Sequence, residues 1–260
     1  MTGDPDALTA LTSLHALEGA AFAAWPALET QDFGPWQLRF AHGYTKRANS
    51  ANATRAVDGL SAAEIEAVEA FYAARQQPTI FRLASFCTSP GTDDALASRG
   101  YHFADLSLVM ALPLAMLAPA ALNSPALECL PDAQQWLPMF EAVSGAHGGA
   151  HATHLAMLQA IPGRCAWGVQ RNAAGEPVSC GLAVVHGHSL GLFDIATRAD
   201  QHGQGLATRL CQGLLAWGRA LACDTAYLQV MAGNLGAIHV YERLGFRRRY
   251  HYWYRVGPQA

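Results

Sequence analysis

Hydrophobic residues in the second half of the chain follow two different spacings. Residues 190–197 and residues 225–231 are short apolar runs, of a length typical of buried strands. Between these runs, apolar residues recur every three or four positions, at Leu206, Leu210, Leu214, Trp217 and Leu221. That spacing places them on one face of an amphipathic helix. The pattern therefore predicts a strand, a polar turn, a helix and a second strand, in that order.

The same patterns predict the elements on both sides of this unit. The first half is expected to contain a helix over residues 3–25, strands over 36–40, 79–86 and 102–112, and a short helix over 94–99. Ser61 and Glu64 have the spacing of a capping box, which opens a further helix. The second half is expected to contain a strand from Glu128, a helix over 134–144 and a hairpin of residues 165–170 and 178–186. Strands and helices therefore alternate along most of the chain.

The polar turn at residues 201–209, QHGQGLATR, has the features of an anion-binding site. Gly203 and Gly205 let the backbone turn its amides outward and let a ligand approach closely. The first N–H groups of the following helix have no partner within the helix, and the helix dipole adds partial positive charge there. The sequence therefore predicts a phosphate or pyrophosphate site at this turn.

Several interpretations of this turn compete. A P-loop needs Gly-Lys-Ser/Thr, and no lysine follows these glycines. A dinucleotide fingerprint needs a third small residue where Thr208 stands, although Asp224 lies about twenty residues further on, as that fingerprint expects. A turn that only connects a strand to a helix is the structural alternative.

Two motifs together carry a resemblance to a known family. The segment HGQGLA at residues 202–207 resembles Arg/Gln-x-x-Gly-x-Gly/Ala, the pyrophosphate loop of the GNAT superfamily of acyl-CoA-dependent N-acetyltransferases. His202 departs from the family's usual Arg or Gln, which we expect to alter affinity rather than abolish binding. Residues 234–246 match the family's Asn-x-x-Ala-x-x-x-Tyr-x-x-x-Gly-Phe at every named position. The resemblance covers residues 127–256, about half of the chain.

The resemblance implies a fold, a cofactor, a reaction and a site. The fold would be α/β with a mixed sheet, with the GNAT fold in the second half of the chain. The co-substrate would be acetyl-CoA, and the reaction would transfer its acetyl group to a primary amine by direct attack in a ternary complex. Tyr241 would protonate the leaving thiolate, Asp194 or a histidine would act as the base, and a backbone N–H near Ile195 would polarise the thioester carbonyl. A bulge would splay the strand at 190–197 from the strand at 225–231. The implied cofactor-binding residues are Ile195, Ala196, Thr197, His202, Gly203, Gln204, Gly205, Leu206, Ala207, Thr208, Asn234 and Tyr241.

Each candidate catalytic residue also has a purely structural interpretation. Asp194 is a charged residue inside an apolar strand, and it could be a carboxylate that only satisfies neighbouring groups. Tyr241 could be a core aromatic on a helix face. His147, His151 and His154 have helical spacing, but Gly148-Gly149 opposes a rigid helix and no acidic or cysteine ligand is near. No metal site is predicted, and one of these histidines is expected to face the amine.

Composition limits the partners. The chain has 260 residues, is 51% hydrophobic and carries a net charge of −3, which gives no electrostatic basis for nucleic-acid binding. No apolar run is long enough to span a membrane, no signal peptide is evident, and the six cysteines show no CxxC pairing. We expect a cytoplasmic monomer or homodimer whose acceptor is a small-molecule or protein amine. A catalytically inactive acyl-CoA sensor or scaffold is the alternative function, and a nucleotide-binding oxidoreductase is a third.

The first half shows a weak internal repeat of the second. Ser98-Arg-Gly-Tyr101 stands after a strand and a helix, as Arg243-Leu-Gly-Phe246 does. We therefore predict a degenerate GNAT-like domain over 1–112, a linker over 113–126 and a catalytic GNAT domain over 127–260, with one CoA bound per chain. The polar stretch at 41–52 is either a solvated loop or a loop that faces substrate or the other domain.

Overall fold

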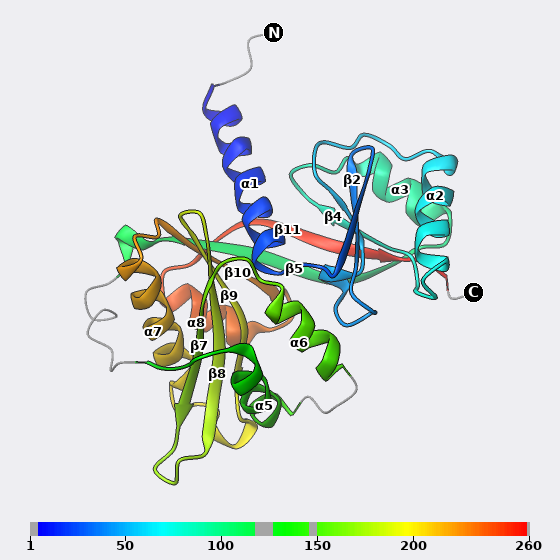
Figure 1. The fold of residues 1–260 in the computed structure, drawn as a ribbon. Helices are drawn as coiled ribbons and strands as arrows, with labels where there is room; N and C mark the ends of the chain where they lie inside the picture. The colour runs from blue at the N-terminus through cyan, green and yellow to red at the C-terminus, as the bar shows by residue number, and fades with distance from the viewer. Residues whose placement is uncertain (1–4, 118–126, 146–149, 259–260) are drawn as a thin grey trace.

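The computed structural model describes residues 5–117, 127–145 and 150–258, and these form one sheet of eleven strands with helices on both faces (Figure 1). The strand order is β1-β2-β3-β4-β11-β5-β10-β9-β8-β7-β6. The strands are β1 (Glu29–Phe33), β2 (Trp36–Phe40), β3 (Ala51–Ala53), β4 (Ile80–Ala84), β5 (His102–Pro113), β6 (Glu128–Leu130), β7 (Arg164–Arg171), β8 (Pro177–His186), β9 (Ser189–Thr197), β10 (Thr225–Met231) and β11 (Arg247–Val256). The helices are α1 (Pro5–Ala24), α2 (Ala62–Ala73), α3 (Pro90–Ser98), α5 (Ala133–Ser144), α6 (His151–Gln159), α7 (Leu206–Ala220) and α8 (Leu235–Arg243). The predicted mixed α/β fold is confirmed.

Local signals in the sequence set the ends of several helices. The capping box of α2 is complete, because Ser61 accepts from the backbone of Glu64 while the Glu64 carboxylate accepts from the backbone of Ser61. Asn234 caps α8 by accepting from Ala237, and Gly245 follows that helix with a φ of 100°. The sequence did not predict β1 and β3. β1 is a polar edge strand without apolar alternation, and β3 has only three residues.

Two strand–helix–strand units, β4–α3–β5 and β10–α8–β11, exchange their last strands in the sheet. β5 pairs with β10 on one side and with β11 on the other, and β11 also pairs with β4. Figure 1 shows β5 and β11 running between the two groups of strands. The segment 1–112 therefore supplies a strand near the middle of the sheet, and the division into two domains stays a prediction. Leu114 and Leu117, at the start of the predicted linker, are buried, and residues 118–126 lie outside the described residues.

The two faces of the sheet have separate apolar cores. Leu192, Leu228 and Val230 pack in one core with residues of α7 and α8. Phe193 and Tyr227 pack in the other with residues of α1, α5 and α6. Neighbouring residues on β9 and β10 thus point to opposite faces, as the strand period requires. In the described part of the chain, no helix is long and apolar enough to cross a bilayer.

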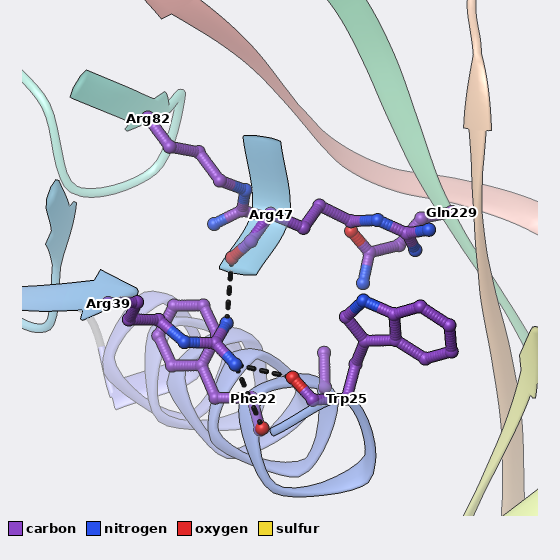
Figure 2. Close-up of a pocket in the computed structure, with 7 residues that line it drawn as sticks. Phe22, Trp25, Arg39, Arg47, Arg82 and Gln229 are labelled. Atoms are coloured by element: carbon purple, nitrogen blue, oxygen red, sulfur yellow. Dashed lines mark hydrogen bonds between the residues drawn. The ribbon is translucent and has the colours of Figure 1, made fainter. Parts of the chain in front are cut away.

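Buried charges attach α1 to the first half of the sheet. Glu18 forms an ion pair with Arg82 of β4, both side chains are almost fully buried, and the Tyr250 hydroxyl also donates to Glu18. Arg39 of β2 donates to the carbonyls of Phe22 and Trp25 at the C-terminal end of α1 (Figure 2). These contacts satisfy carbonyls that a helix end leaves without partners. Burial lowers the pKa of Arg39 to about 10, so the group stays charged at neutral pH.

The polar stretch at 41–52 is not a solvated loop, and that interpretation was wrong. Asn49, Ser50 and Asn52 are buried. The Asn49 side-chain oxygen accepts from the backbone of Ala41 at 2.7 Å and of Gly43 at 2.9 Å, which fixes the turn. The Arg39 guanidinium donates to the carbonyl of residue 47 at 3.0 Å. The loop is held rigidly against α1, with its outer residues directed at the second half of the chain.

We predict that Glu18→Leu lowers the free energy of unfolding by about 3–5 kcal/mol, because it leaves the Arg82 guanidinium buried without a counter-charge. Urea unfolding measures this loss. Adding Arg82→Met should recover most of it. Glu29→Leu, which breaks an ion pair at a side chain that is 52% exposed, is the matched control and should cost less than about 1 kcal/mol. Equal losses in the two single variants would contradict this role of the buried pair.

Candidate active site

A bulge in β9 opens the sheet at its centre. Cys180 pairs with Ala196 and Leu182 pairs with Phe193, so Gly181 lies opposite both Asp194 and Ile195. Asp194 has a φ of 48°, which is uncommon for any residue but glycine. The parallel pairing between β9 and β10 ends at Leu192 and Leu228. From there to its end, β9 has no pairing with β10, as the sequence led us to expect.

A cleft of about 540 Å³ lies on the face covered by α7 and α8, and we call it the helix-side cleft. It is lined by Ile195, Thr197, Gln201, His202, Gly203, Gly205, Leu206, Ala207, Thr208, Asn234, Gly236, Ala237, Val240, Tyr241 and Arg243. This set contains ten of the twelve cofactor-binding residues implied by the sequence. The other two lie beside the cleft. The Ala196 carbonyl accepts from Ser179, and the Gln204 carbonyl accepts from Arg209.

The glycine turn has the geometry that an anion site needs. Gly203 and Gly205 have φ of 78° and 73°, and a Cβ at Gly203 would meet nothing within 4 Å. Gly205 is the N-cap of α7, and no side chain caps the helix, so its first amides remain for a ligand. His202 Nε2 lies 2.9 Å from the carbonyl of Thr197. This contact ties the turn to the end of β9 and gives the unusual histidine a structural task.

A second cavity, of about 210 Å³, occupies the opening between β9 and β10, and we call it the gap cavity. Its lining contains Leu228 and Val230 from one face of the sheet and Phe193 and Gln229 from the other. Four residues line both this cavity and the helix-side cleft: Ile195, Asn234, Ala237 and Tyr241. The two spaces therefore meet, and the gap cavity leads from one face of the sheet to the other.

Both candidate catalytic residues line the gap cavity. Asp194 has a side chain that is 13% exposed, and Tyr241 is 8% exposed and lines the helix-side cleft as well. Burial raises the pKa of Tyr241, so the phenol keeps its proton at neutral pH. The structure brings these two residues together with the glycine turn, although they come from different elements.

A chain of hydrogen bonds orients Asp194. His154 Nε2 lies 2.9 Å from an Asp194 carboxylate oxygen, and His154 Nδ1 lies 2.7 Å from the Tyr44 hydroxyl. A neutral imidazole satisfies both contacts, because Nε2–H donates to the carboxylate while Nδ1 accepts from the phenol. The Tyr44 ring also stacks on His154, with centroids 4.6 Å apart. Burial, and next the charge of Asp194, raises the pKa of Tyr44, so the phenol remains a donor.

The other histidines of this region have different roles. His151 lies 2.8 Å from the Glu141 carboxylate, so His151 and His154 pair with separate acidic residues. His147 lies outside the described residues, and the expected spacing of three histidines is therefore not tested. Among the residues that are described, no group of three or more potential ligands could hold a metal ion. His154 is the histidine of this region that reaches the candidate catalytic carboxylate.

A third cavity, of about 380 Å³, lies between the loop at 43–47 and strands β5, β10 and β11, and we call it the loop-side cavity. It shares Arg47, Gln229, Val230 and Met231 with the gap cavity. Tyr44, Arg47 and Gln229 had no role predicted from the sequence. The polar stretch at 41–52 was a signal for the first two, and a glutamine inside the apolar run at 225–231 was a signal for the third.

Comparison with known proteins identifies the class. The family described as "Probable histone acetyltransferase Rv0428c C-terminal" matches residues 12–255. The uncharacterized N-acetyltransferase YobR of Bacillus subtilis (strain 168) is 27% identical over 250 residues, which cover 95% of this chain and 99% of that protein. The chain belongs to this acetyltransferase family and to the GNAT superfamily.

Solved structures share the fold over nearly the whole chain. A GCN5-related N-acetyltransferase from Kribbella flavida has a TM-score of 0.72 at 16% identity, covering 95% of this chain and 96% of that one. A tandem GNAT protein from the clavulanic acid biosynthesis pathway has a TM-score of 0.61 at 14% identity, covering 96% of this chain and 89% of that one. At 16% and 14% identity, these similarities show a shared fold alone.

We predict that Tyr44→Phe lowers the free energy of unfolding by about 1–3 kcal/mol, because it leaves the buried Nδ1 of His154 without a donor. Urea unfolding of the single variants and the double variant forms a double-mutant cycle. In the His154→Leu background the cost of Tyr44→Phe should fall well below its value in the wild type. The same cost in both backgrounds would show that the phenol does not act through His154.

Proposed function

We propose that this protein transfers the acetyl group of acetyl-CoA to a primary amine by direct attack in a ternary complex. One observation carries the proposal: the gap between β9 and β10 joins the glycine-turn cleft to Asp194 and Tyr241. A cofactor site and an acid–base pair on one continuous space are what such a transfer requires.

The residues of the helix-side cleft fit a CoA molecule. Open space beside Gly203 and the uncapped start of α7 suit a pyrophosphate. The unpaired edge of β9 at Ile195 to Thr197 suits the amide-bearing pantetheine arm, since backbone groups there face the gap without a strand partner. Acetyl-CoA supplies an activated acyl group as a thioester. A backbone N–H near Ile195 would donate to the carbonyl oxygen of that group.

Asp194 would accept the proton that the amine loses as its nitrogen bonds to the acyl carbon. His154 holds one carboxylate oxygen of Asp194, and Asp194 lines the gap cavity. The His154 side chain is 4% exposed and does not line that cavity, so it acts as a positioning residue. Fixing a base within hydrogen-bond reach of its proton is the main requirement for general-base catalysis.

Tyr241 would donate its phenolic proton to the sulfur as the carbon–sulfur bond breaks. Burial raises the pKa of Tyr241 above that of an ordinary phenol, so the hydroxyl still carries its proton when the sulfur gains charge. No cysteine lines the helix-side cleft or the gap cavity, which favours direct attack over an acyl-enzyme route. The acceptor would be a small-molecule or protein amine. The protein itself would be a cytoplasmic monomer or homodimer, without nucleic-acid or membrane partners.

The second candidate function is an inactive acyl-CoA sensor or scaffold. Such a protein would bind CoA and would not release it from acetyl-CoA with any amine. The hydrogen-bonded chain from Tyr44 to Asp194 favours an enzyme, because a binding protein has no need of an oriented carboxylate at the gap.

We predict that acetyl-CoA raises the melting temperature, because a ligand that binds only the folded state stabilises it by mass action. Gly205→Asp should remove most of this shift by placing a carboxylate against the pyrophosphate. Gly175→Asp is the matched control, since Gly175 also has a positive φ, of 82°, but lies in the β7–β8 hairpin turn. Differential scanning fluorimetry compares the two variants. A full shift in Gly205→Asp would remove the glycine turn from the cofactor site.

We predict that Tyr241→Phe lowers kcat by about 10²–10⁴-fold and barely changes the Kd for acetyl-CoA, because only the proton donor is lost. Tyr227→Phe is the control, since that hydroxyl is buried without a hydrogen-bond partner and lines none of the three cavities. Single-turnover kinetics ensures that chemistry is the step observed. Unchanged turnover in Tyr241→Phe would assign Tyr241 a packing role alone.

A further inference from the structure

Arg47 is an uncompensated cation at the point where the cavities meet. It lines the gap cavity, the loop-side cavity and a small cavity beside α1 (Figure 2). No carboxylate among the described residues forms an ion pair with it, whereas neighbouring Lys46 is paired with Asp105 at 2.6 Å. Its guanidinium lies over the Trp25 ring, 5.2 Å from the centroid, which restricts the side chain. A half-buried guanidinium that is held against a ring and has no ion-pair partner is a site for an anion.

Gln229 provides a second unpartnered group in the same place. Its side-chain oxygen is buried and accepts no hydrogen bond. Figure 2 shows the Gln229 amide next to the guanidinium of Arg47 and the indole of Trp25, and the three residues line one small cavity. A buried oxygen without a donor costs free energy unless a ligand supplies one. An amine N–H is such a donor.

Asp194 completes the arrangement with a negative charge. Arg47, Gln229 and Asp194 all line the gap cavity, so one space holds a cation, a hydrogen-bond acceptor and an anion. This set is complementary to a molecule that carries both an amine and an anionic group. Arg47 does not line the helix-side cleft, so its charge is not directed at the expected pyrophosphate.

We propose that the acceptor is a small amino acid, with its carboxylate on Arg47 and its amine directed to Asp194 and Gln229. This assignment rests on the proposed function of the site. In the transfer, the amine nitrogen bonds to the acyl carbon and gives a proton to Asp194. The carbon–sulfur bond breaks, and the sulfur takes the proton of Tyr241. The products are an N-acetylamino acid and CoA.

The charge of Arg47 favours a carboxylate as the anionic group, and the size of the loop-side cavity favours a small molecule. The planar fork of arginine matches the two oxygens of a carboxylate. The gap cavity and the loop-side cavity contain one further lysine or arginine, Lys46, which is paired with Asp105, so the single charge of Arg47 suits a carboxylate better than a phosphate dianion. The loop-side cavity has a volume of about 380 Å³ and is lined by the loop at 43–47 and by residues of β5, β10 and β11, which is a space for a small ligand.

The test compares each common amino acid with its primary amide as acceptor, at saturating acetyl-CoA, with CoA release as the readout. The amide keeps the size and the amine but lacks the carboxylate. Its amine is also less basic, so amine reactivity alone would favour the amide. We expect kcat/KM for at least one amino acid to exceed that of its amide by about tenfold or more, the contribution of one charged hydrogen-bonded contact.

Variants of Arg47 connect this preference to the guanidinium. Arg47→Met should reduce the preference to about twofold or less, Arg47→Lys should retain part of it, and both should keep the Kd for acetyl-CoA measured by calorimetry. Arg55→Met is the matched control, because Arg55 is exposed in the same half of the chain and should leave the preference unchanged. If Arg47→Met does not fold, the reduced preference of Arg47→Lys supports the same conclusion.

The outcomes separate the inference from the proposed function. Equal or better turnover of every amide, a preference that survives Arg47→Met, or better turnover of a C-terminally amidated lysine peptide would overturn the amino-acid assignment and leave the acetyltransferase intact. Tight acetyl-CoA binding without turnover of any amine would overturn the proposed function, and the acceptor assignment with it.

Discussion

The loss of pairing between β9 and β10 is the constraint on which the rest of the site depends. Parallel strands that stayed paired to their ends would close the sheet, and no ligand could reach from one face to the other. The bulge opposite Gly181 prevents this, because two residues of β9 occupy the space of one. A Cβ at position 181 would lie 2.5 Å from the end of the Ile195 side chain, so a larger residue there would force Ile195 to move. The opening that results carries both candidate catalytic side chains.

The first half of the chain completes the site from the other face. Its strand β5 lies against β10, its helix α1 brings Trp25 against Phe193 of β9, and its loop brings Tyr44 to His154. Buried charges fix α1 and the loop to one another, since Arg39 binds the end of α1 and the carbonyl of residue 47. The stability of the N-terminal core and the geometry of the acceptor side are therefore coupled.

The sequence predicted the parts of the site that are local in the chain. The glycine turn, the start of α8 and the catalytic candidates on β9 and α8 all depend on a few consecutive residues with a known spacing. Tyr44 and His154 are 110 positions apart, and no periodicity records that they meet. The sequence also does not show that β5 and β11 exchange places in the sheet, because a strand has the same hydrophobic pattern whichever strand it pairs with. The polar composition of residues 41–52 is evident from the sequence, but the residues that this loop contacts are evident only from the fold.

A crystal structure of the protein with acetyl-CoA would show whether the gap between β9 and β10 is the reaction site. We expect one molecule per chain, with its pyrophosphate at residues 203–208, its pantetheine arm along β9 and its acetyl group in the gap between β9 and β10, near Asp194 and Tyr241. A molecule bound on the face of α1 and α5, or one whose acetyl group lies away from the gap, would contradict it.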